Sequence, residues 1–324
     1  MVVQINATDC LSDTESGDLK GRYLDDNSYE TLITEDCDYY YQGRLLFKFR
    51  KKMVPEPLLK VAWTNCASLA KKGRGRGAAA GYIDKDSVYW SKRDISWSNK
   101  WSAKYMVDDG NGSKKESKMK VNNEVASTPI GFYGAKRGLG GDYPCRMSHY
   151  TKTNLDKYHK AIPFFQHLSQ VYQNLVPDKF NEQMDRAEIN DFHIDKTPYS
   201  TITINRNFRT GVHKDSGDFG GWATLSVLEE NKYHGGYFVL PQYKVAIDMR
   251  HGDILVCNVH EYHGNTELYE TEEDKLFNDT AKQSFKDNLE VGVLGLNNRF
   301  SRLSFVCYLR EDIIHCPIGG NLPI

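Results

Sequence analysis

The hydrophobic pattern divides the chain into a helical part and a later part rich in strands. Between residues 154 and 175, apolar side chains recur at helical spacing, which predicts a helix with one buried face. Asn154 can cap this helix and Pro177 follows its end, while Pro163 inside the pattern predicts a kink or a junction of two helices. A second, shorter helix is expected over residues 178–186.

Short strands follow Pro198. Segments rich in β-branched and aromatic residues are separated there by Gly, Asp, Asn and Pro. They are STITINRNF (200–208), WATLSVLE (222–229), GGYFVLP (235–241), YKVAIDM (243–249), GDILVCN (252–258) and RLSFVCYL (302–309). Many short strands at close spacing predict a β-barrel or sandwich, against which the upstream helices pack.

The part before the helices is irregular. Residues 1–44 are acidic and polar, which predicts poor order. Within residues 45–126, Gly81–Trp90 reads as a strand-like piece and Asp108–Lys118 as an exposed loop. We therefore divide the chain into an acidic N-terminal segment, a basic and aromatic region, and a main domain over 127–324. That domain is expected to have helical support at 150–190 and a β-core at 198–312.

Composition adds limits to this division. The chain has 324 residues, of which 40% are hydrophobic, and it contains no stretch of 18 apolar residues that could cross a membrane. Its start lacks the positive and apolar segments of a secretory signal. Seven Cys without a CxxC pair argue against a zinc site or a disulfide framework. These features predict an intracellular protein with free thiols, nuclear in a eukaryote and cytoplasmic otherwise.

The net charge of −1 conceals a local excess of basic residues. Lys71, Lys72, Arg74 and Arg76 lie in KKGRGRG, and a lysine-rich run covers 114–120. Six aromatic residues lie between them: Tyr82, Tyr89, Trp90, Trp97, Trp101 and Tyr105. Basic and aromatic residues together can neutralise phosphates and stack on bases. Charge alone favours the simpler interpretation of a solvated loop beside core aromatics.

Candidate metal ligands occur where the strands begin. The sequence GVHKDSGD places His213 and Asp215 two residues apart, so an extended backbone directs both side chains to the same side. A third ligand is expected fifty residues later, in NVHEYHGN. His263 is preferred because Gly follows it directly, while His260 and His251 are the alternatives. Two His and one carboxylate on one face of an ion suit non-haem Fe(II), because three coordination positions stay open.

An iron enzyme of this kind that uses 2-oxoglutarate also needs a cation for the far carboxylate of that cosubstrate. Arg302 begins a strongly alternating strand, and the guanidinium group binds carboxylates in a bidentate manner. Ser304, Val306 and Tyr308 share its parity. The competitors are Arg299, in a turn before the strand, and Arg310, beyond its far end.

Three further polar residues lie near the expected ligands. Asp218 can contact substrate or cap a turn, and the sequence favours neither reading. Asn205 and Asn207, on the strand leading to His213, can donate amide hydrogen bonds to a cosubstrate carboxylate or stand as ordinary polar residues at a strand edge.

Taken together, these motifs resemble a known family. STITINRNFRTGVHKDSGD, GGYFVLPQYKVAIDMRHGDILVCNVHEYHGN and RLSFVCYLRE are similar to the core of the TET/JBP oxygenases, the ten-eleven translocation and J-binding protein enzymes. PCRMSHYTKTNLDKYHKAIPFFQHLSQVYQNLVPDKF looks like the helical segment before that core in microbial, viral, fungal and algal members. The resemblance covers roughly residues 127–312. No CXXC zinc-finger segment, Cys-rich region or J-specific binding domain accompanies it.

The resemblance implies an α+β fold whose core is a double-stranded β-helix, the jelly-roll or cupin-like architecture. It implies that His213, Asp215 and His263 bind Fe(II) and that Arg302 binds 2-oxoglutarate, with O₂ as cosubstrate and ascorbate as an admissible reductant. The implied reaction oxidises the 5-methyl group of 5-methylcytosine or thymine in DNA, with the base flipped out of the helix. No membrane or protein partner is indicated.

Contacts to the substrate are the least determined part of this picture. Asp218, Arg146 and His149 are guessed as contacts to the flipped base, and Arg74 and Arg76 as contacts to DNA. Two rival hypotheses remain. One keeps the chemistry but exchanges the substrate for a protein side chain or a free nucleotide. The other is a non-catalytic, cupin-like module that only binds.

Overall fold

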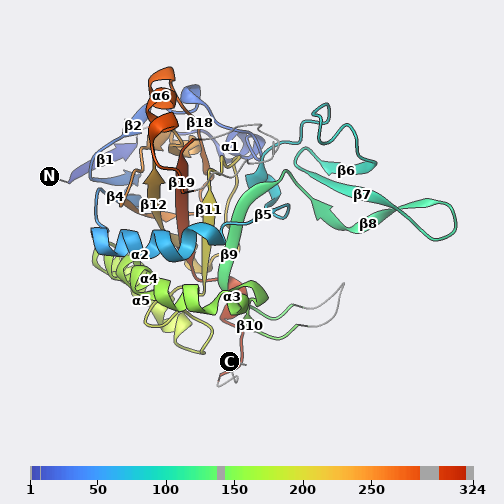
Figure 1. Cartoon of the computed structure of the whole chain (residues 1–324). Helices are drawn as coiled ribbons and strands as arrows, with labels where there is room; N and C mark the ends of the chain where they lie inside the picture. The colour runs from blue at the N-terminus through green and yellow to red at the C-terminus, as the bar shows by residue number, and fades with distance from the viewer. Residues whose placement is uncertain (1, 8, 137–142, 285–298, 319–324) are drawn as a thin grey trace.

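Two β-sheets lie face to face, and helices cover the outer face of the larger one (Figure 1). The computed structural model describes residues 2–7, 9–136, 143–284 and 299–318. The helices are α1 (Asp13–Asp18), α2 (Glu56–Cys66), α3 (His149–Thr153), α4 (Leu155–Leu175), α5 (Pro177–Ala187) and α6 (Glu272–Thr280).

The larger sheet has ten strands. It comprises β1 (Val3–Ala7), β3 (Cys37–Tyr41), β4 (Arg44–Arg50), β16 (Ile254–Asn258), β12 (Trp222–Glu230), β19 (Ser301–Tyr308), β11 (Thr201–Arg206), β9 (Val125–Tyr133) and β10 (Arg146–Met147) in that order, with β5 (Lys72–Gly73) also paired to β9. The smaller sheet has the order β17 (Gly264–Asn265), β14 (Phe238–Leu240), β15 (Val245–Ile247) and β2 (Thr31–Ile33). Two short strands, β13 (His234–Gly235) and β18 (Leu268–Tyr269), pair with each other.

The pairing confirms the predicted core. In the larger sheet, β11, β19, β12 and β16 are joined by antiparallel ladders, and the chain crosses to the smaller sheet for β14 and β15 and again for β17. Apolar residues from both sheets, among them Phe47, Leu225 and Val245, form one buried cluster between them. This is the double-stranded β-helix within an α+β chain. Each strand predicted after Pro198 is present.

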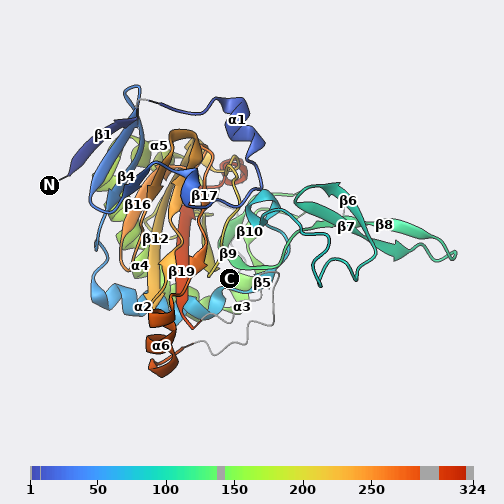
Figure 2. The ribbon, with the colours of Figure 1, turned by 90° about the horizontal axis from the view of Figure 1, so that it is seen from above.

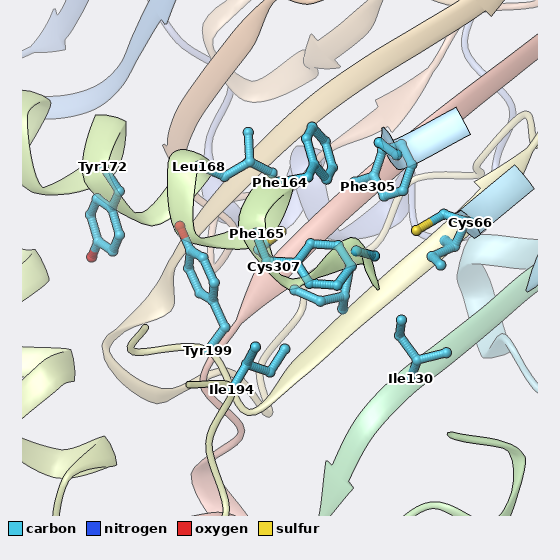
Figure 3. Close-up of a cluster of buried hydrophobic side chains, with 14 of the residues drawn as sticks. Cys66, Ile130, Phe164, Phe165, Leu168, Tyr172, Ile194, Tyr199, Phe305 and Cys307 are labelled. Carbon is cyan, nitrogen blue, oxygen red and sulfur yellow. The ribbon is translucent and has the colours of Figure 1, made fainter. Parts of the chain in front are cut away.

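A second core lies between the larger sheet and the helices (Figure 3). Leu303, Phe305 and Cys307 of β19 belong to it, and Phe305 meets Phe164 of α4 edge-on at 5.0 Å between ring centroids. Because side chains alternate along a strand, the intervening residues of β19 point to the opposite face. The amphipathic face of α4 therefore determines which face of β19 is left for other functions.

The long predicted helix is one continuous α4, so the alternative of two helices meeting at Pro163 is wrong. The junction of helices lies earlier, where Asn154 separates α3 from α4. Asn154 occupies the N-cap position, but its amide does not cap α4 because it donates to the carbonyl of Tyr150 in the preceding turn. The second helix, α5, begins one residue before the predicted segment and ends one residue after it.

The acidic segment 1–44 differs from the expectation of poor order. In its described part, β3 pairs with β4 and extends the larger sheet, while β2 pairs in parallel with β15 of the smaller sheet. Ile33, Cys37 and Tyr39 are buried in the core between the sheets. A few well-placed apolar residues outweigh the polar composition of the segment.

An arm projects from the body on one side (Figures 1 and 2). It is the three-stranded sheet β6 (Ile95–Asn99), β7 (Ser102–Asp108) and β8 (Lys114–Val121). The predicted loop Asp108–Lys118 is therefore wrong for its second half, which continues as β8. The strand-like reading of Gly81–Trp90 is wrong as well, because these residues form turns whose Ile83 and Trp90 build a small core with the arm.

The cysteines also depart from the expectation of free thiols. Cys145 and Cys316 form a disulfide with their Cα atoms 5.9 Å apart, which ties the segment before β10 to the end of the described chain. Cys10, Cys37, Cys66, Cys257 and Cys307 are free. Spacing along the sequence cannot reveal a bridge across 171 residues. Within the described ranges, none of the helices combines the length and apolar character of a membrane crossing.

Candidate active site

The backbone brings the candidate ligands together. His213 lies in the connection between β11 and β12, and His263 directly precedes β17. The two residues form an antiparallel bridge in which each amide N–H donates to the carbonyl of the other, both at 2.9 Å. The amide of Asp215 donates to the carbonyl of Val259 at 3.0 Å. Three backbone bonds thus fix two segments that are fifty residues apart.

The three side chains converge as the spacing predicts. One ligand atom from each of His213, Asp215 and His263 lies within 4.8 Å of the others. Nε2 of His213 and Nε2 of His263 are each 3.6 Å from an oxygen of Asp215. Nitrogen and oxygen atoms at these separations can share one metal ion, because metal–ligand bonds near 2 Å put the ligands about 3 Å apart on its surface.

Both imidazoles are held in the tautomer that a metal needs. Nδ1 of His213 lies 2.8 Å from the carbonyl of Gly211, and Nδ1 of His263 lies 2.9 Å from the carbonyl of Glu261. A carbonyl only accepts hydrogen bonds, so each Nδ1 carries the proton and each Nε2 presents its lone pair toward Asp215. The contact of each Nδ1 with a carbonyl group therefore leaves Nε2 of the same ring free to bind a metal ion.

The surroundings of His213 and Asp215 favour the protonation states in which these side chains can bind a metal ion. Burial, together with the neighbouring His263, lowers the pKa of His213 to about 4, so this ring is neutral at neutral pH. Burial by itself raises the pKa of Asp215, but the two histidines outweigh it and hold that pKa below its usual range. A neutral imidazole beside an ionised carboxylate is the donor set for a divalent cation.

The alternative third ligands point elsewhere. Nε2 of His260 lies 2.8 Å from the carbonyl of Asp218, and Nδ1 of His251 accepts the amide of Glu229. His260 therefore ties together the two segments that carry the ligands. Of the three histidines that the sequence offered, His263 alone joins the cluster.

A cavity of about 490 Å³ opens over the triad, which is large enough for a cosubstrate and a nucleobase. Its wall includes all four residues that share the parity of Arg302 on β19: Arg302, Ser304, Val306 and Tyr308. Thr203 and Asn205 of β11 continue the same wall. The face of the larger sheet that is turned away from the helices is thus the floor of the pocket.

Arg302 is the buried cation of this wall. Only 5% of the residue is exposed, and its Nε has no hydrogen-bond partner among the residues that the structure describes. A buried guanidinium with a free donor is costly unless an anion completes it. Arg299 instead forms ion pairs with Asp279 and Glu270. Arg310 pairs with Asp312 and lies over the ring of Tyr133.

Asn205 and Arg76 belong to one polar chain across the wall. Nε of Arg76 donates to Oγ of Ser127 at 2.6 Å, Ser127 donates to Oδ1 of Asn205 at 2.5 Å, and Nδ2 of Asn205 reaches Oγ of Ser304 at 3.2 Å. One terminal nitrogen of Arg76 is buried without a partner among the described residues. The pocket therefore contains a second cation besides Arg302, and it comes from the segment before β9.

Asp218 lines the pocket beside Asp215. It is buried, and its Oδ2 has no partner within the described part of the chain. Burial and the charge of Asp215 raise the pKa of Asp218 well above its usual range. A protonated carboxyl group in this place can donate one hydrogen bond and accept another, which fits the edge of a base.

Four predicted residues do not reach the pocket wall. The amide of Asn207 is occupied by the backbone of β19, accepting from Arg302 and donating to Phe300. Arg74 pairs with Glu124 and stacks on Tyr89. Arg146 is paired with Tyr133 at the far end of β9, six residues beyond the pocket residue Ser127 or about 20 Å along a strand. His149 begins α3 next to it.

Several pocket residues were not among the site residues expected from sequence, although Trp101 was named there as one of the aromatic residues of the basic region. Ser127 comes from β9, and Lys20 and Trp101 lie at the mouth, with Nζ of Lys20 5.6 Å from the centre of the Trp101 ring. Nothing near Ser127 or Lys20 in sequence resembles a motif, so only the tertiary structure could place these two residues in the pocket. Thr203 had a signal, because it shares the parity of Asn205.

The fold and the triad define the class of non-haem iron oxygenases with a double-stranded β-helix. Residues 130–311 match the family model Tet_JBP, the oxygenase domain of the 2OGFeDO superfamily. The match covers more than half of the chain, and the chain belongs to this TET/JBP family of oxygenases. The expected fold and family are thereby confirmed.

The chain is similar in sequence to known members of the family. The thymine dioxygenase JBP1 of Trypanosoma brucei brucei is 33% identical over 150 residues, which are 46% of this chain and 18% of that protein. The bifunctional helicase and thymine dioxygenase JBP2 of Trypanosoma brucei brucei (strain 927/4 GUTat10.1) is 30% identical over 234 residues, 71% of this chain and 18% of that protein. The similarity thus spans less than a fifth of the length of these relatives.

A solved structure shares the architecture. NgTET1 in complex with 5mC DNA superposes with a TM-score of 0.50 at 10% identity and covers 90% of this chain and 86% of that one. At this identity the likeness concerns the fold.

The geometry predicts which third histidine binds metal. His263→Ala should lower the affinity for Co(II), used as a probe of the iron site, by about 100-fold or more, because one of three ligands is lost. His260→Gln is the matched control, and it should bind Co(II) within a few-fold of the parent. Titration calorimetry under nitrogen measures both. Equal losses in the two variants would contradict the assignment.

The lowered pKa of His213 predicts a pH dependence of stability. As the pH falls below about 6.5, the unfolded chain takes up a proton on this ring before the folded, metal-free protein does. The free energy of unfolding of the metal-free protein should therefore fall between pH 6.5 and 4, by up to about 3 kcal/mol from this residue. Urea unfolding at pH 7.5 and 5 compares the parent with His213→Gln, which should lose less stability on acidification. An identical pH dependence would show that His213 is not the group involved.

Proposed function

We propose that this chain is an Fe(II)- and 2-oxoglutarate-dependent dioxygenase that oxidises the 5-methyl group of a pyrimidine in DNA, thymine or 5-methylcytosine, to the hydroxymethyl form. The observation that carries the proposal is the convergence of a ligating His-Asp-His triad and a buried, incompletely bonded Arg302 in one pocket. A TET/JBP oxygenase domain in the chain and thymine dioxygenases among its relatives support the choice of reaction.

The residues present fit an iron ion. His213, Asp215 and His263 would hold it through two Nε2 atoms and one carboxylate, all on one side. Iron binds such a set because three further positions stay open for small ligands. Bound iron with 2-oxoglutarate would supply the oxidising power to hydroxylate a C–H bond, using O₂ and giving succinate and CO₂ as coproducts.

The residues also fit 2-oxoglutarate. Arg302 presents a free, buried donor for the distal carboxylate, and Ser304 on the same face of β19 offers a hydroxyl beside it. Asn205 and Arg76 lie on the other part of the wall, where they would contact a second carboxylate or the substrate. Val306 and Leu225 form a neighbouring apolar part of the wall, further along β19 from Arg302.

The mouth of the pocket fits a base that has left the helix. Trp101 offers a stacking surface, and Asp218 offers a carboxyl group with both donor and acceptor character. A base inside a duplex cannot bring its methyl group to a triad at the bottom of a pocket, so the nucleotide would be extruded. Lys20 beside Trp101 would then face the displaced phosphate.

The function is tested by following the products on DNA. The protein is incubated with Fe(II), 2-oxoglutarate and oligonucleotides that contain thymine and 5-methylcytosine, first without and then with O₂. Mass spectrometry of the nucleosides should show oxygen-dependent 5-hydroxymethyluracil or 5-hydroxymethylcytosine, and Asp215→Ala should abolish it. Succinate release that is indifferent to DNA would discard DNA as substrate and favour a protein or a free nucleotide. No succinate under any condition would favour a module that only binds.

The role of Arg302 is tested against its neighbour. Arg302→Lys keeps the charge but loses the bidentate fork, so the KM for 2-oxoglutarate should rise about tenfold or more. Arg299→Lys is the matched control, because Arg299 is engaged in ion pairs with Asp279 and Glu270, and it should leave the KM within about twofold. A larger effect at Arg299 would reverse the assignment.

A further inference from the structure

The projecting arm is larger than the fold requires. β7 and β8 extend from the body as a long ribbon, and their tip lies far from both sheets (Figures 1 and 2). The side chains that anchor the arm gather at its root, where Ala103 and Val121 join Trp90 in a small separate core. The outer half of the arm buries little apolar surface and contributes little to stability.

Its charge is unbalanced. Residues 95–121 contain six lysines against three acidic residues, in a chain whose net charge is −1. All three acids are already engaged. Glu116 pairs with Lys104, while Asp108 and Asp109 accept backbone amides of the turn at the tip. Lys114 pairs with Asp94, just before the arm, and the charges of the other lysines are not compensated by ion pairs within the arm.

Three lysines on β8 stand without partners. Lys115, Lys118 and Lys120 are exposed, and their ammonium groups make neither a hydrogen bond nor an ion pair with any residue that the structure describes. Lys120 lies directly opposite Lys104 in the ladder, an arrangement of like charges that disfavours the pairing. Because Glu116 compensates the charge of Lys104, the charge of Lys120 is the one left without a counterion.

The strand is irregular at the same place. The register shifts between Lys104 and Met106, where two steps on β7 correspond to four on β8, so residues 117–119 bulge outward. Met119, with 74% of its surface exposed, is held there between Lys118 and Lys120. Lysines often protect an edge strand from unwanted pairing. In β8 the bulge already interrupts the edge of the sheet, and the exposed Met119 would not prevent pairing. Protection of the edge therefore does not explain this arrangement.

The root of the arm is part of the pocket. Trp101, in the turn between β6 and β7, lines the mouth, and Lys104 with its opposite residue Lys120 follows about 7 Å further along the strand from Ser102. From Ser102 to Asp108 the arm extends about 20 Å, along which one strand of a duplex presents about six phosphates.

We propose that the arm binds the phosphodiester backbone of DNA beside the pocket, with Lys115, Lys118 and Lys120 as phosphate contacts and Met119 placed against the sugars or base edges. The choice of DNA as the polyanion rests on the proposed function. The arm holds the duplex next to the mouth, so that the extruded base and the basic strand engage the same molecule. Its positive charge lowers the dissociation constant through counterion release rather than through base recognition.

The test replaces the three lysines by glutamine and follows binding of a short methylated duplex by fluorescence anisotropy at several salt concentrations. Each lost phosphate contact lowers the slope of log K against log salt by about 0.9, so the triple variant should lose about 2 to 3 from the slope and bind at least tenfold more weakly near 0.1 M salt. Replacing the same lysines by arginine keeps the charge and should preserve the affinity.

Lys60→Gln with Lys152→Gln is the control, because these exposed lysines lie on α2 and α3, in the layer of helices and away from the arm. It should leave the slope unchanged. An unchanged slope in the arm variant would overturn the proposal. So would displacement of the duplex by polyglutamate at equal charge concentration, since that would show a site for acidic polypeptides.

Base oxidation, followed in the same samples, separates this proposal from the proposed function. If the parent oxidises the base and the arm variant binds DNA as the parent does, the proposed role of the arm is refuted and the proposed reaction stands. If binding depends on the arm but no oxidised base forms, the proposed reaction is refuted and the proposed role of the arm stands. A parent that binds no duplex at low salt would refute both.

Discussion

The antiparallel bridge between His213 and His263 is the contact on which the candidate site depends. Two backbone hydrogen bonds of 2.9 Å join the connection after β11 to the residue before β17. They set the separation of the two imidazoles and place Asp215 between them. These main-chain bonds fix the backbone positions, and the contacts of each Nδ1 with a carbonyl group fix the orientation of the two rings. The site is therefore preorganised for a metal by the sheet itself.

The rest of the pocket follows from alternation along β19. Its apolar residues, such as Phe305, face the helices, so the intervening positions must face the opposite way. Arg302 is consequently buried near the triad with a donor left over, which the helices cannot satisfy. One strand thus connects the stability of the helical layer with the binding of an anion in the pocket.

The arm and the body differ in packing and in exposed charge. Most buried apolar residues of the body belong to two large cores, one between the sheets and one beneath the helices. The arm has a core of its own and exposes a row of uncompensated lysines. An average charge near zero therefore hides a basic strand that begins beside the pocket mouth. Charge at this scale acts on a partner rather than on the fold.

Much of this protein could be predicted from local sequence. Helix α4 and the strands after Pro198 follow from hydrophobic periodicity, and the convergence of His213 with Asp215 follows from a spacing of two in extended backbone. Alternation also placed Ser304, Val306 and Tyr308 with Arg302, because the period of a strand is local and strict. The tertiary structure alone decided contacts between distant segments. Examples are the burial of the acidic segment, the disulfide of Cys145 with Cys316, and the meeting of Trp101 and Lys20 at the pocket. Such contacts depend on how strands pair across tens of residues, and no residue carries that information in its own neighbourhood.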